Sequence, residues 1–532
     1  MKNLKGLFAS ALVSFALFLQ AQKDPPKIVV GIVVDQMRYD YLQRYYNDFG
    51  EGGFKKLMNQ GFSAENLHYH YKPTYTGPGH ASIFTGAPPA KHGIVGNNWY
   101  SREEEKVVYC AESLKKGGGY WMSPQRLKGR TISDEMKLFF GKKAKVFGVS
   151  LKDRGAILPV GHLADGAYWF DGDLGKWISS DYYQTPNPDW LNSFNQQDFL
   201  ELYLSKAWDL SLEEKDYSES NADQTNYENE LFQGSGVSFP YNLLEAYREK
   251  GWGVLKSIPQ GNRMTTDLTL KVIEANQLGV DDIPDFLSVS YSATDYVGHR
   301  FGVGSRELHD TYVKLDQDLE RLIAHLEKTI GKDNFILFLT SDHGAGEVRN
   351  HLKELGAPNG RLRTKQIKEQ LDSALDANFG PMNWISSLIN LNIYFNPEVF
   401  ENDIVDRESI FAFATAWLAE QDGIQQVWNV QTGTNTFQYS EIIERGYNKQ
   451  ESGDLILLEK AAWSNYSDKG STHGSPYQYD THVPFLLYGK NLDRSTSTKA
   501  YTIANIAPTV AYLMGVPAPD LAINKLIQEA LK

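Results

Sequence analysis

Short runs of apolar and β-branched residues recur along the chain, and polar residues follow each run at once. Near-continuous apolar runs are typical of strands in a parallel sheet that helices cover on both faces. Helical patterns lie between them: apolar residues recur at three- and four-residue spacing from Ser305 to Gly331, and residues 503–514 form a second stretch of this kind. The strand-like runs are Lys27–Val34, Lys145–Leu151, Phe286–Tyr291, Asn334–Thr340 and Val483–Tyr488.

This alternation of strands and helices predicts an α/β fold. We expect a three-layer α/β/α sandwich with a mostly parallel central sheet and inserted cap segments. Residues 168–262 and 345–470 do not follow the alternation; the first is rich in Trp, Tyr, Asn and Asp, and the second is mixed. We interpret both as insertions that roof the site within a single domain of residues 22–532. The alternative is that they decorate the surface independently.

Residues 1–21 have the pattern of a secretory signal peptide. Lys2 and Lys5 precede an apolar run, Gly6–Leu19, and Ala21 is a small residue at the expected cleavage site. A membrane anchor is the alternative, but it needs about 20 apolar residues, and this run is shorter. No later stretch of the sequence is long and apolar enough to span a bilayer. We therefore expect an exported protein, in the periplasm or secreted, without stable membrane association.

The composition excludes several classes of function. Of the 532 residues, 53 are Lys or Arg and 66 are Asp or Glu, so the net charge is −13. A nucleic-acid binder needs a basic footprint, and we expect no nucleic-acid partner. The single cysteine, Cys110, excludes an intrachain disulfide and a zinc site made of several thiolates. Any metal site must therefore be built from histidines and carboxylates.

Acidic and imidazole side chains occur where the strand-like runs end. Ligands in such sheets bind beyond the carboxyl ends of the strands, so these groups are placed to converge on two divalent metals. Imidazole ligands favour zinc over magnesium. Each group alone is explained equally well by a helix cap or by chance spacing, and only their joint placement favours a metal site. The candidate ligands are Asp35, Asp295, His299, Asp342, His343 and His473.

Two histidines, His473 and His482, compete for the last position in this set. His482 begins the last strand-like run, and in a parallel sheet it would lie at the edge opposite the site. His473 lies in the preceding loop, Gly470–Gly474, and is free to reach across. We therefore predict that His473 is the ligand.

A nucleophile is available in the turn-rich loop of residues 73–82. Thr76 is expected at the start of a helix, where backbone N–H groups support an anion. A free threonine hydroxyl is a poor nucleophile, so it needs a metal to hold it as an alkoxide. The alternative role for Thr76 is an ordinary helix cap, and we interpret His80 as a packed structural histidine.

The order of these residues resembles that of the alkaline phosphatase superfamily, and most closely the bacterial PafA-type alkaline phosphatases. The likeness extends from Lys27 to about Pro517. It is carried by the motifs VVDQMRYDYL at Val33–Leu42, GNNWY at Gly96–Tyr100, SLKDR at Ser150–Arg154, YSATDYVGH at Tyr291–His299 and IANIAPTVAYLMGVP at Ile503–Pro517. A sulfatase of the same superfamily would need Cys or Ser where this chain has Thr76.

The resemblance implies a role for each candidate residue. One zinc ion would be held by Asp295, His299 and His473. The other would be held by Asp35, Asp342 and His343, with Thr76 bridging to it as the nucleophile that forms a phosphothreonine. The non-bridging phosphate oxygens would be bound by Asn97, Lys152 and Arg154. Because a lysine stands where three-metal relatives bind magnesium, no third metal is expected.

Charge counting supports a monoester substrate. Two zinc ions bring about four positive charges, and three aspartates with a Thr76 alkoxide offset about four. Lys152 and Arg154 then contribute about two positive charges, which match the dianion of a phosphate monoester. The predicted function is hydrolysis of small-molecule phosphate monoesters. The alternatives are a phosphodiesterase or nucleotide pyrophosphatase of the same superfamily and a non-catalytic exported zinc-binding protein. We expect a monomer, although no feature of the sequence determines the oligomeric state.

Overall fold

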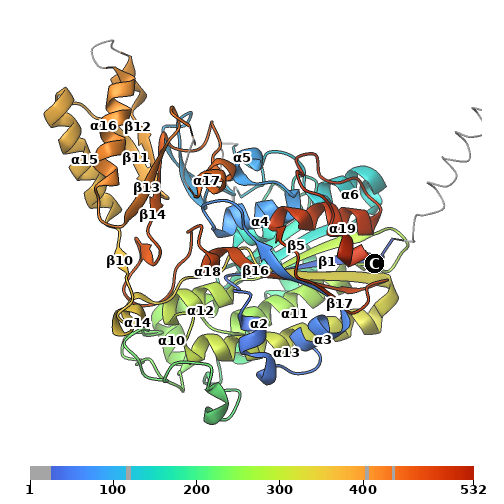
Figure 1. Ribbon diagram of the computed structural model, residues 1–532. Coiled ribbons are helices and arrows are strands. Elements are labelled where there is room, and N and C mark those ends of the chain that lie inside the picture. The colour runs from blue at the N-terminus through green and yellow to red at the C-terminus, as the bar shows by residue number, and fades with distance from the viewer. Residues whose placement is uncertain (1–24, 115–121, 402–405, 434–437, 532) are drawn as a thin grey trace, which may run out of the picture.

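The computed structural model describes residues 25–114, 122–401, 406–433 and 438–531, and the predicted signal peptide lies outside these ranges. A central sheet of ten strands has helices on both faces (Figure 1). The strands follow the order β17-β2-β16-β9-β1-β8-β5-β6-β7, and β18 pairs with β2. Their bounds are β1 Ile28–Val34, β2 Phe62–His68, β5 Val146–Ser150, β6 Gly166–Asp171, β7 Lys176–Ile178, β8 Asp285–Tyr291, β9 Phe335–Thr340, β16 His482–Gly489, β17 Ser495–Ser497 and β18 Tyr501–Thr502.

The middle of this sheet is parallel. β9, β1, β8, β5 and β6 pair with one another in parallel, in that order, and every residue of β1, β8 and β9 is buried. Burial on both faces explains why these strands read as continuous apolar runs rather than alternating ones. The predicted α/β/α sandwich with a mostly parallel sheet is confirmed.

One strand runs against the expected direction. β16 is antiparallel to both β2 and β9, with Phe485 opposite Thr340 and Gly489 opposite Ile336. The expectation that this run is a parallel strand is therefore wrong, because a run buried on both faces fits either direction. As a consequence His482, the first residue of β16, lies at the same edge of the sheet as the carboxyl end of β9.

Helices bury both faces of the sheet (Figure 1). On one face, Leu268 of α11, Val297 of α12 and Leu315 of α13 share a core with Val30 and Leu287 of the strands. This layer contains α2 Tyr41–Arg44, α3 Phe54–Gln60, α11 Gln260–Ala275, α12 Ala293–Phe301 and α13 Arg306–Thr329. The other layer contains α4 Thr76–Thr85, α5 Pro89–His92, α6 Ile132–Phe140, α7 Asp153–Ile157 and α19 Ile506–Met514.

A second, four-stranded sheet stands at one side of the molecule, at the upper left of Figure 1. We call it, with its two helices, the outer sheet; it has its own core around Leu371, Ile393, Phe411 and Leu455. Its elements are α15 Thr364–Phe379, β11 Ile385–Ile389, β12 Asn392–Phe395, α16 Arg407–Ala419, β13 Ile424–Asn429 and β14 Leu455–Glu459. All of them fall within the predicted insertion of residues 345–470.

The other predicted insertion, residues 168–262, begins inside the central sheet, because it starts within β6 and includes β7. Its remaining helices are α8 Asp189–Phe194, α9 Phe199–Tyr203 and α10 Leu243–Lys250. The short elements elsewhere are β3 Asn98–Ser101, β4 Lys106–Tyr109, α14 Arg349–Glu354, β10 Gly360–Arg361, α17 Ser440–Gly446, β15 Trp463–Ser464 and α18 Gln478–Thr481.

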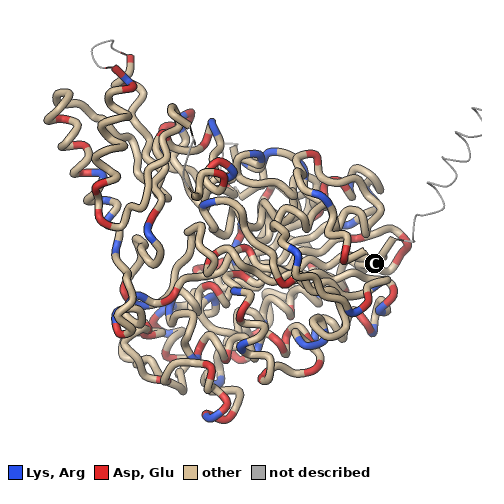
Figure 2. The backbone as a smooth tube through the Cα atoms, viewed as in Figure 1, with Lys and Arg blue, Asp and Glu red and all other residues tan. Residues whose placement is uncertain are grey.

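Charged residues are interspersed along the helices that cover the sheet (Figure 2). Many pair locally: Lys137 and Asp165 lie 2.7 Å apart, and Lys368 and Asp372 lie 2.8 Å apart along α15. Exposed pairs of this kind stabilise a fold by only about 0–1 kcal/mol each. The buried faces of the two sheets therefore supply most of the stability.

Helix α13 offers a direct test of the sequence pattern. The Ser305 hydroxyl accepts a hydrogen bond from the Leu308 backbone N–H at 3.1 Å and caps the helix, at the residue where the predicted helical pattern begins. We expect Ser305→Ala to lower the free energy of unfolding by about 1 kcal/mol, measured by urea denaturation. Ser373→Ala, at an exposed position inside α15, is the matched control and should cause no loss. Equal stability of the two variants would contradict the capping role.

Candidate active site

The carboxyl ends of three neighbouring strands bring three aspartates together. Asp35 follows β1, Asp342 follows β9, and Asp295 lies in the first turn of α12, directly after β8. The parallel register sets the strand ends level, with Val34 opposite Tyr291. All three aspartates are 0–3% exposed. The sheet thus concentrates carboxylates in a space almost without water.

One group of side chains able to hold a metal consists of Asp295, His299 and His473. Asp295 Oδ1 lies 3.2 Å from His299 Nε2 and 3.6 Å from His473 Nε2. Asp295 and His299 share a face of α12 because they are four residues apart. Ligands bound to tetrahedral zinc at about 2.0–2.2 Å lie about 3.3–3.6 Å from one another. The observed separations therefore suit such an ion.

A second group is marked by three buried atoms without a hydrogen-bond partner: Asp35 Oδ1, Asp342 Oδ2 and His343 Nε2. His343 Nε2 lies 3.5 Å from each of the two carboxylate oxygens. Leaving a buried polar atom unsatisfied costs roughly 1–3 kcal/mol, and more for a charged group. A metal ion would satisfy all three atoms at once. Asp295 is also within ligand distance of Asp35 and His343, so the two groups are neighbours.

A backbone carbonyl fixes the ring orientation of each of the three histidines. The Nδ1 atoms of His299, His343 and His473 lie 2.8, 3.0 and 2.7 Å from the carbonyl oxygens of Ser471, Gly344 and Thr74. A carbonyl can only accept, so each Nδ1 carries the proton. In the neutral ring, Nε2 then keeps its lone pair toward the aspartates, which is the arrangement that metal ligation requires.

Burial sets the charge state of these groups. It lowers the pKa of His343 to about 3, and it lowers the pKa of His473 well below the ordinary value, with the neighbouring His343 adding to the effect. Burial also raises the pKa of Asp35 and Asp342. His299 differs: burial disfavours its charge, but Asp295 outweighs this effect and raises its pKa. A metal binds the neutral form of each imidazole.

Lys152 lies between the two groups. Its Nζ is 2.6 Å from Asp35 Oδ2 and 2.6 Å from Asp295 Oδ2, and its side chain is 2% exposed. Burial disfavours its charge, but Asp295 and Asp35 outweigh this effect and raise its pKa. The ammonium thus neutralises part of the aspartate charge, a contact that the sequence did not suggest.

The first turn of α4 packs directly on this cluster. Thr76 is the first residue of the helix and is 1% exposed. A Cβ on Gly79 would lie 2.3 Å from the Asp342 carbonyl oxygen, so only glycine permits this close approach. The positive end of the helix dipole favours an anion. The structure therefore places the first turn of α4, which begins with Thr76, against Asp342.

Asn97 and Arg154 approach from other segments. Asn97 Oδ1 accepts a hydrogen bond from the Gly77 N–H at 2.7 Å, which sets its amide beside Thr76. Arg154, in α7, donates to the Tyr109 hydroxyl at 3.2 Å. Tyr109 in turn donates to Asp153, which fixes the guanidinium. Tyr109 thus connects Arg154 to Asp153, and it lies outside the motifs that carry the resemblance.

Residues 29–483 match the model of the type I phosphodiesterase / nucleotide pyrophosphatase family. The chain belongs to this family.

Similar members span nearly the whole chain. A protein of Myroides odoratus named calcium-transporting ATPase is 38% identical over 98% of this chain and 97% of its own length. Alkaline phosphatase PhoV of Synechococcus elongatus is 40% identical over 95% of this chain and 93% of its own length. The crystal structure of alkaline phosphatase PafA is 37% identical, covers 96% of this chain and 100% of that one, and superposes with a TM-score of 0.91. The predicted resemblance to the alkaline phosphatase superfamily is confirmed.

Gln36 connects the two ligand groups through hydrogen bonds, and the sequence analysis did not predict this role. Its side chain donates to Asp295 Oδ1 at 2.7 Å, and its backbone N–H donates to Asp342 Oδ1 at 3.1 Å. The residue has a φ of 65°, which a glutamine seldom adopts. A Cβ on Gly298 would lie 1.9 Å from Gln36 Oε1. The position directly after Asp35 was the only available signal.

His80 and His482 lie outside the two ligand groups. His80 is buried and packs as predicted, with Nδ1 2.9 Å from the Thr76 carbonyl oxygen and Nε2 3.0 Å from Ser290 Oγ. Its Nδ1 also lies 3.4 Å from Asp342 Oδ2, so it packs against the second ligand group. His482 stacks on Tyr39 and on His68, and its Nε2 donates to a backbone carbonyl. These contacts, rather than strand direction, separate His482 from His473.

Metal analysis of two histidine variants tests this distinction. We expect His473→Ala to lower the metal-to-protein ratio, because it removes a ligand atom beside Asp295, whereas His482→Ala should bind as much metal as the unaltered protein. The ratio is measured by elemental mass spectrometry after dialysis. An unchanged ratio in His473→Ala, or a loss in His482→Ala alone, would contradict the assignment.

Proposed function

We propose that this protein is a metal-dependent phosphatase that hydrolyses phosphate monoesters through a phosphothreonine intermediate, with two zinc ions. The hydrolysis of monoesters rests on similarity to alkaline phosphatases over almost the full chain. One observation carries the mechanism: Asp35, Asp342 and His343 converge with orphaned ligand atoms beside the helix turn that begins with Thr76.

The proposed metal sites use the ligands named above. Asp295, His299 and His473 would hold one zinc ion, and Asp35, Asp342 and His343 the other. When bound, the ions would supply Lewis-acid charge to the threonine oxygen and to the leaving oxygen. Zinc rather than magnesium is supported by the three imidazoles in the ligand set.

The reaction is divided into two displacements. Thr76 Oγ gives up its proton and attacks phosphorus, the bond to the leaving oxygen breaks, and a phosphothreonine forms while the leaving oxygen takes up a proton and departs as an alcohol. Water then attacks the phosphothreonine and releases inorganic phosphate while Thr76 regains its proton. Asn97 and Arg154 bind the non-bridging oxygens, where charge is spread in the transition state.

Charge favours a monoester over a diester. Lys152 contributes its positive charge to the site whether it contacts Asp35 and Asp295 or the phosphate itself. Together with Arg154 it supports a dianion, whereas a diester carries one negative charge and a second organic group. The phosphodiesterase alternative, which the family's name includes, is weaker on this ground. A non-catalytic zinc-binding protein would need neither Thr76 nor Arg154 beside its ligands.

We further propose that the protein is exported and acts as a single catalytic domain on small phosphate esters in the periplasm or outside the cell. Residues 1–21 support export through their signal-peptide pattern. Within the described ranges, no helix combines the length and apolar character needed to cross a bilayer.

The role of the nucleophile can be tested by substitution. Thr76→Ala should lower kcat on an aryl phosphate monoester by at least about a thousandfold, because no covalent intermediate can form. The metal content should stay unchanged, since the six proposed protein ligands remain. Thr76→Ser, which keeps a hydroxyl, should restore measurable turnover. Substantial turnover by Thr76→Ala would retire the phosphothreonine step.

Arg154 provides the test of substrate charge. We expect Arg154→Ala to lower kcat/KM for monoesters about 100- to 1000-fold, by analogy with the loss of one transition-state donor. The loss for an aryl phosphodiester should be smaller, because a diester presents less charge. Arg130→Ala, which removes a surface arginine paired with Glu135, is the control. Equal losses on both substrates would contradict the charge argument.

A further inference from the structure

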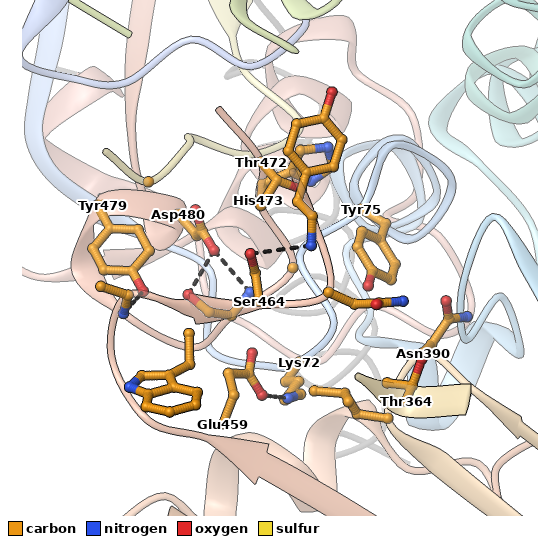
Figure 3. A pocket seen from close by; sticks show the side chains of 18 of the residues that line it. Lys72, Tyr75, Thr364, Asn390, Glu459, Ser464, Thr472, His473, Tyr479 and Asp480 are labelled. Atoms are coloured by element: carbon orange, nitrogen blue, oxygen red, sulfur yellow. Dashed lines mark hydrogen bonds and ion pairs between the residues drawn. The ribbon is translucent and has the colours of Figure 1, made fainter. Parts of the chain in front are cut away.

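A cavity of about 480 Å³ lies between the outer sheet and the central body (Figure 3). Leu388 and Leu391, at the turn of the β11–β12 hairpin, line one side, and Gly474 and Tyr479 line the other. Cavities that enclose small organic ligands have volumes of about 300–1000 Å³. The space is therefore large enough for a group the size of a nucleoside.

The cavity adjoins the proposed reaction centre. His473, a member of the first ligand group, and Tyr75, the residue before Thr76, both line it. Their rings meet edge to face at 5.5 Å. In-line attack by Thr76 sends the leaving group to the opposite side of phosphorus. A leaving oxygen near the ligand group of His473 would carry its organic substituent into this cavity.

The cavity walls favour a planar apolar group. Trp463, Tyr466 and Tyr479 contribute aromatic rings beside the two leucines. A Cβ on Gly423 would lie 2.1 Å from the indole ring of Trp463, so this ring is held tightly by the backbone. Rigid aromatic side chains bind a flat ring by stacking or edge contacts at little cost in conformational entropy.

The positive charges at the cavity wall are already paired. Lys72 forms a buried ion pair with Glu459 (Figure 3); the Lys72 side chain is 3% exposed and the Glu459 side chain is 6% exposed. Arg349 lies 2.8 Å from Asp468 and also donates to backbone carbonyls. A leaving group with a further phosphate would find no unpaired lysine or arginine among these lining residues. The wall presents neutral groups, such as those of Asn390 and Ser464, and the acidic residues Glu347 and Asp480, which would repel a further phosphate.

We propose that this cavity is the leaving-group subsite and that it takes a neutral leaving group with an aromatic ring, as in a nucleoside monophosphate. It selects against short aliphatic alcohols, which leave the aromatic walls uncovered. It also selects against leaving groups that carry further phosphates, which would stay unpaired. This inference rests on the proposed function, because it concerns the substrate of the same site.

The unaltered enzyme is tested first, on three phosphate esters. In each, the phosphate that is followed is bound to a primary alcohol, at the 5′ or terminal position, so the intrinsic reactivities of the three bonds are similar. They are adenosine 5′-monophosphate, glycerol 1-phosphate and adenosine 3′,5′-bisphosphate. We expect kcat/KM for the 5′-phosphate of adenosine 5′-monophosphate to exceed both others by at least about tenfold. Phosphate release and product analysis by chromatography give the three values.

A cavity-filling variant then locates the preference. Thr364, the first residue of α15, lines the cavity, whereas the side chain of Lys365 is 91% exposed. We expect Thr364→Trp to reduce kcat/KM for adenosine 5′-monophosphate at least about tenfold more than for glycerol 1-phosphate. Lys365→Trp places the same indole outside the cavity and should change neither value. Circular dichroism and inhibition by inorganic phosphate report the fold and the phosphate site.

The possible results separate the two proposals. Hydrolysis of all three esters without a preference, or equal losses in Thr364→Trp, would overturn the subsite and leave the phosphatase intact. The absence of hydrolysis of any ester by the metal-loaded protein would overturn the proposed function and the subsite with it.

Discussion

The repulsion among Asp35, Asp295 and Asp342 is the constraint on which the site depends. Three carboxylates with 0–3% exposure cannot rely on water to spread their charge. Lys152 relieves part of it through 2.6 Å contacts to two of them. The unpaired oxygens of Asp35 and Asp342 face His343 and leave a need for cations. Three local features surround the carboxylates. They are the imidazoles oriented by backbone carbonyls, Gln36 at positive φ, and the first turn of α4, which approaches Asp342 closely through Gly79.

The fold provides this concentration of charge because its strands are parallel. Parallel strands end at one edge, so residues that are hundreds of positions apart come level with one another. The buried faces of β1, β8 and β9 hold that edge rigid, and α12 continues from β8 to present Asp295 and His299 together. The repulsion among the aspartates would be relieved if the strand ends moved apart. The tightly packed hydrophobic core prevents this movement.

Chemistry and selectivity are supplied by different layers of the molecule. The central sheet and α4 provide the proposed ligands and the nucleophile, whereas the outer sheet contributes a wall of the cavity next to His473. The outer sheet has a core of its own, so its lining residues can change without disturbing the metal ligands.

The sequence by itself determined the buried strands, because a strand buried on both faces requires a continuous run of apolar residues. It also determined which acidic and imidazole residues follow those runs. It also determined the cap of α13 at Ser305, since capping depends on neighbouring residues. Only the tertiary structure decided the antiparallel direction of β16, the pairing of Lys152 with two aspartates, the bridge formed by Gln36 and the cavity at the outer sheet. Local patterns record how a segment is buried, whereas these features depend on which distant segments become neighbours. That choice is made by the packing of the whole chain.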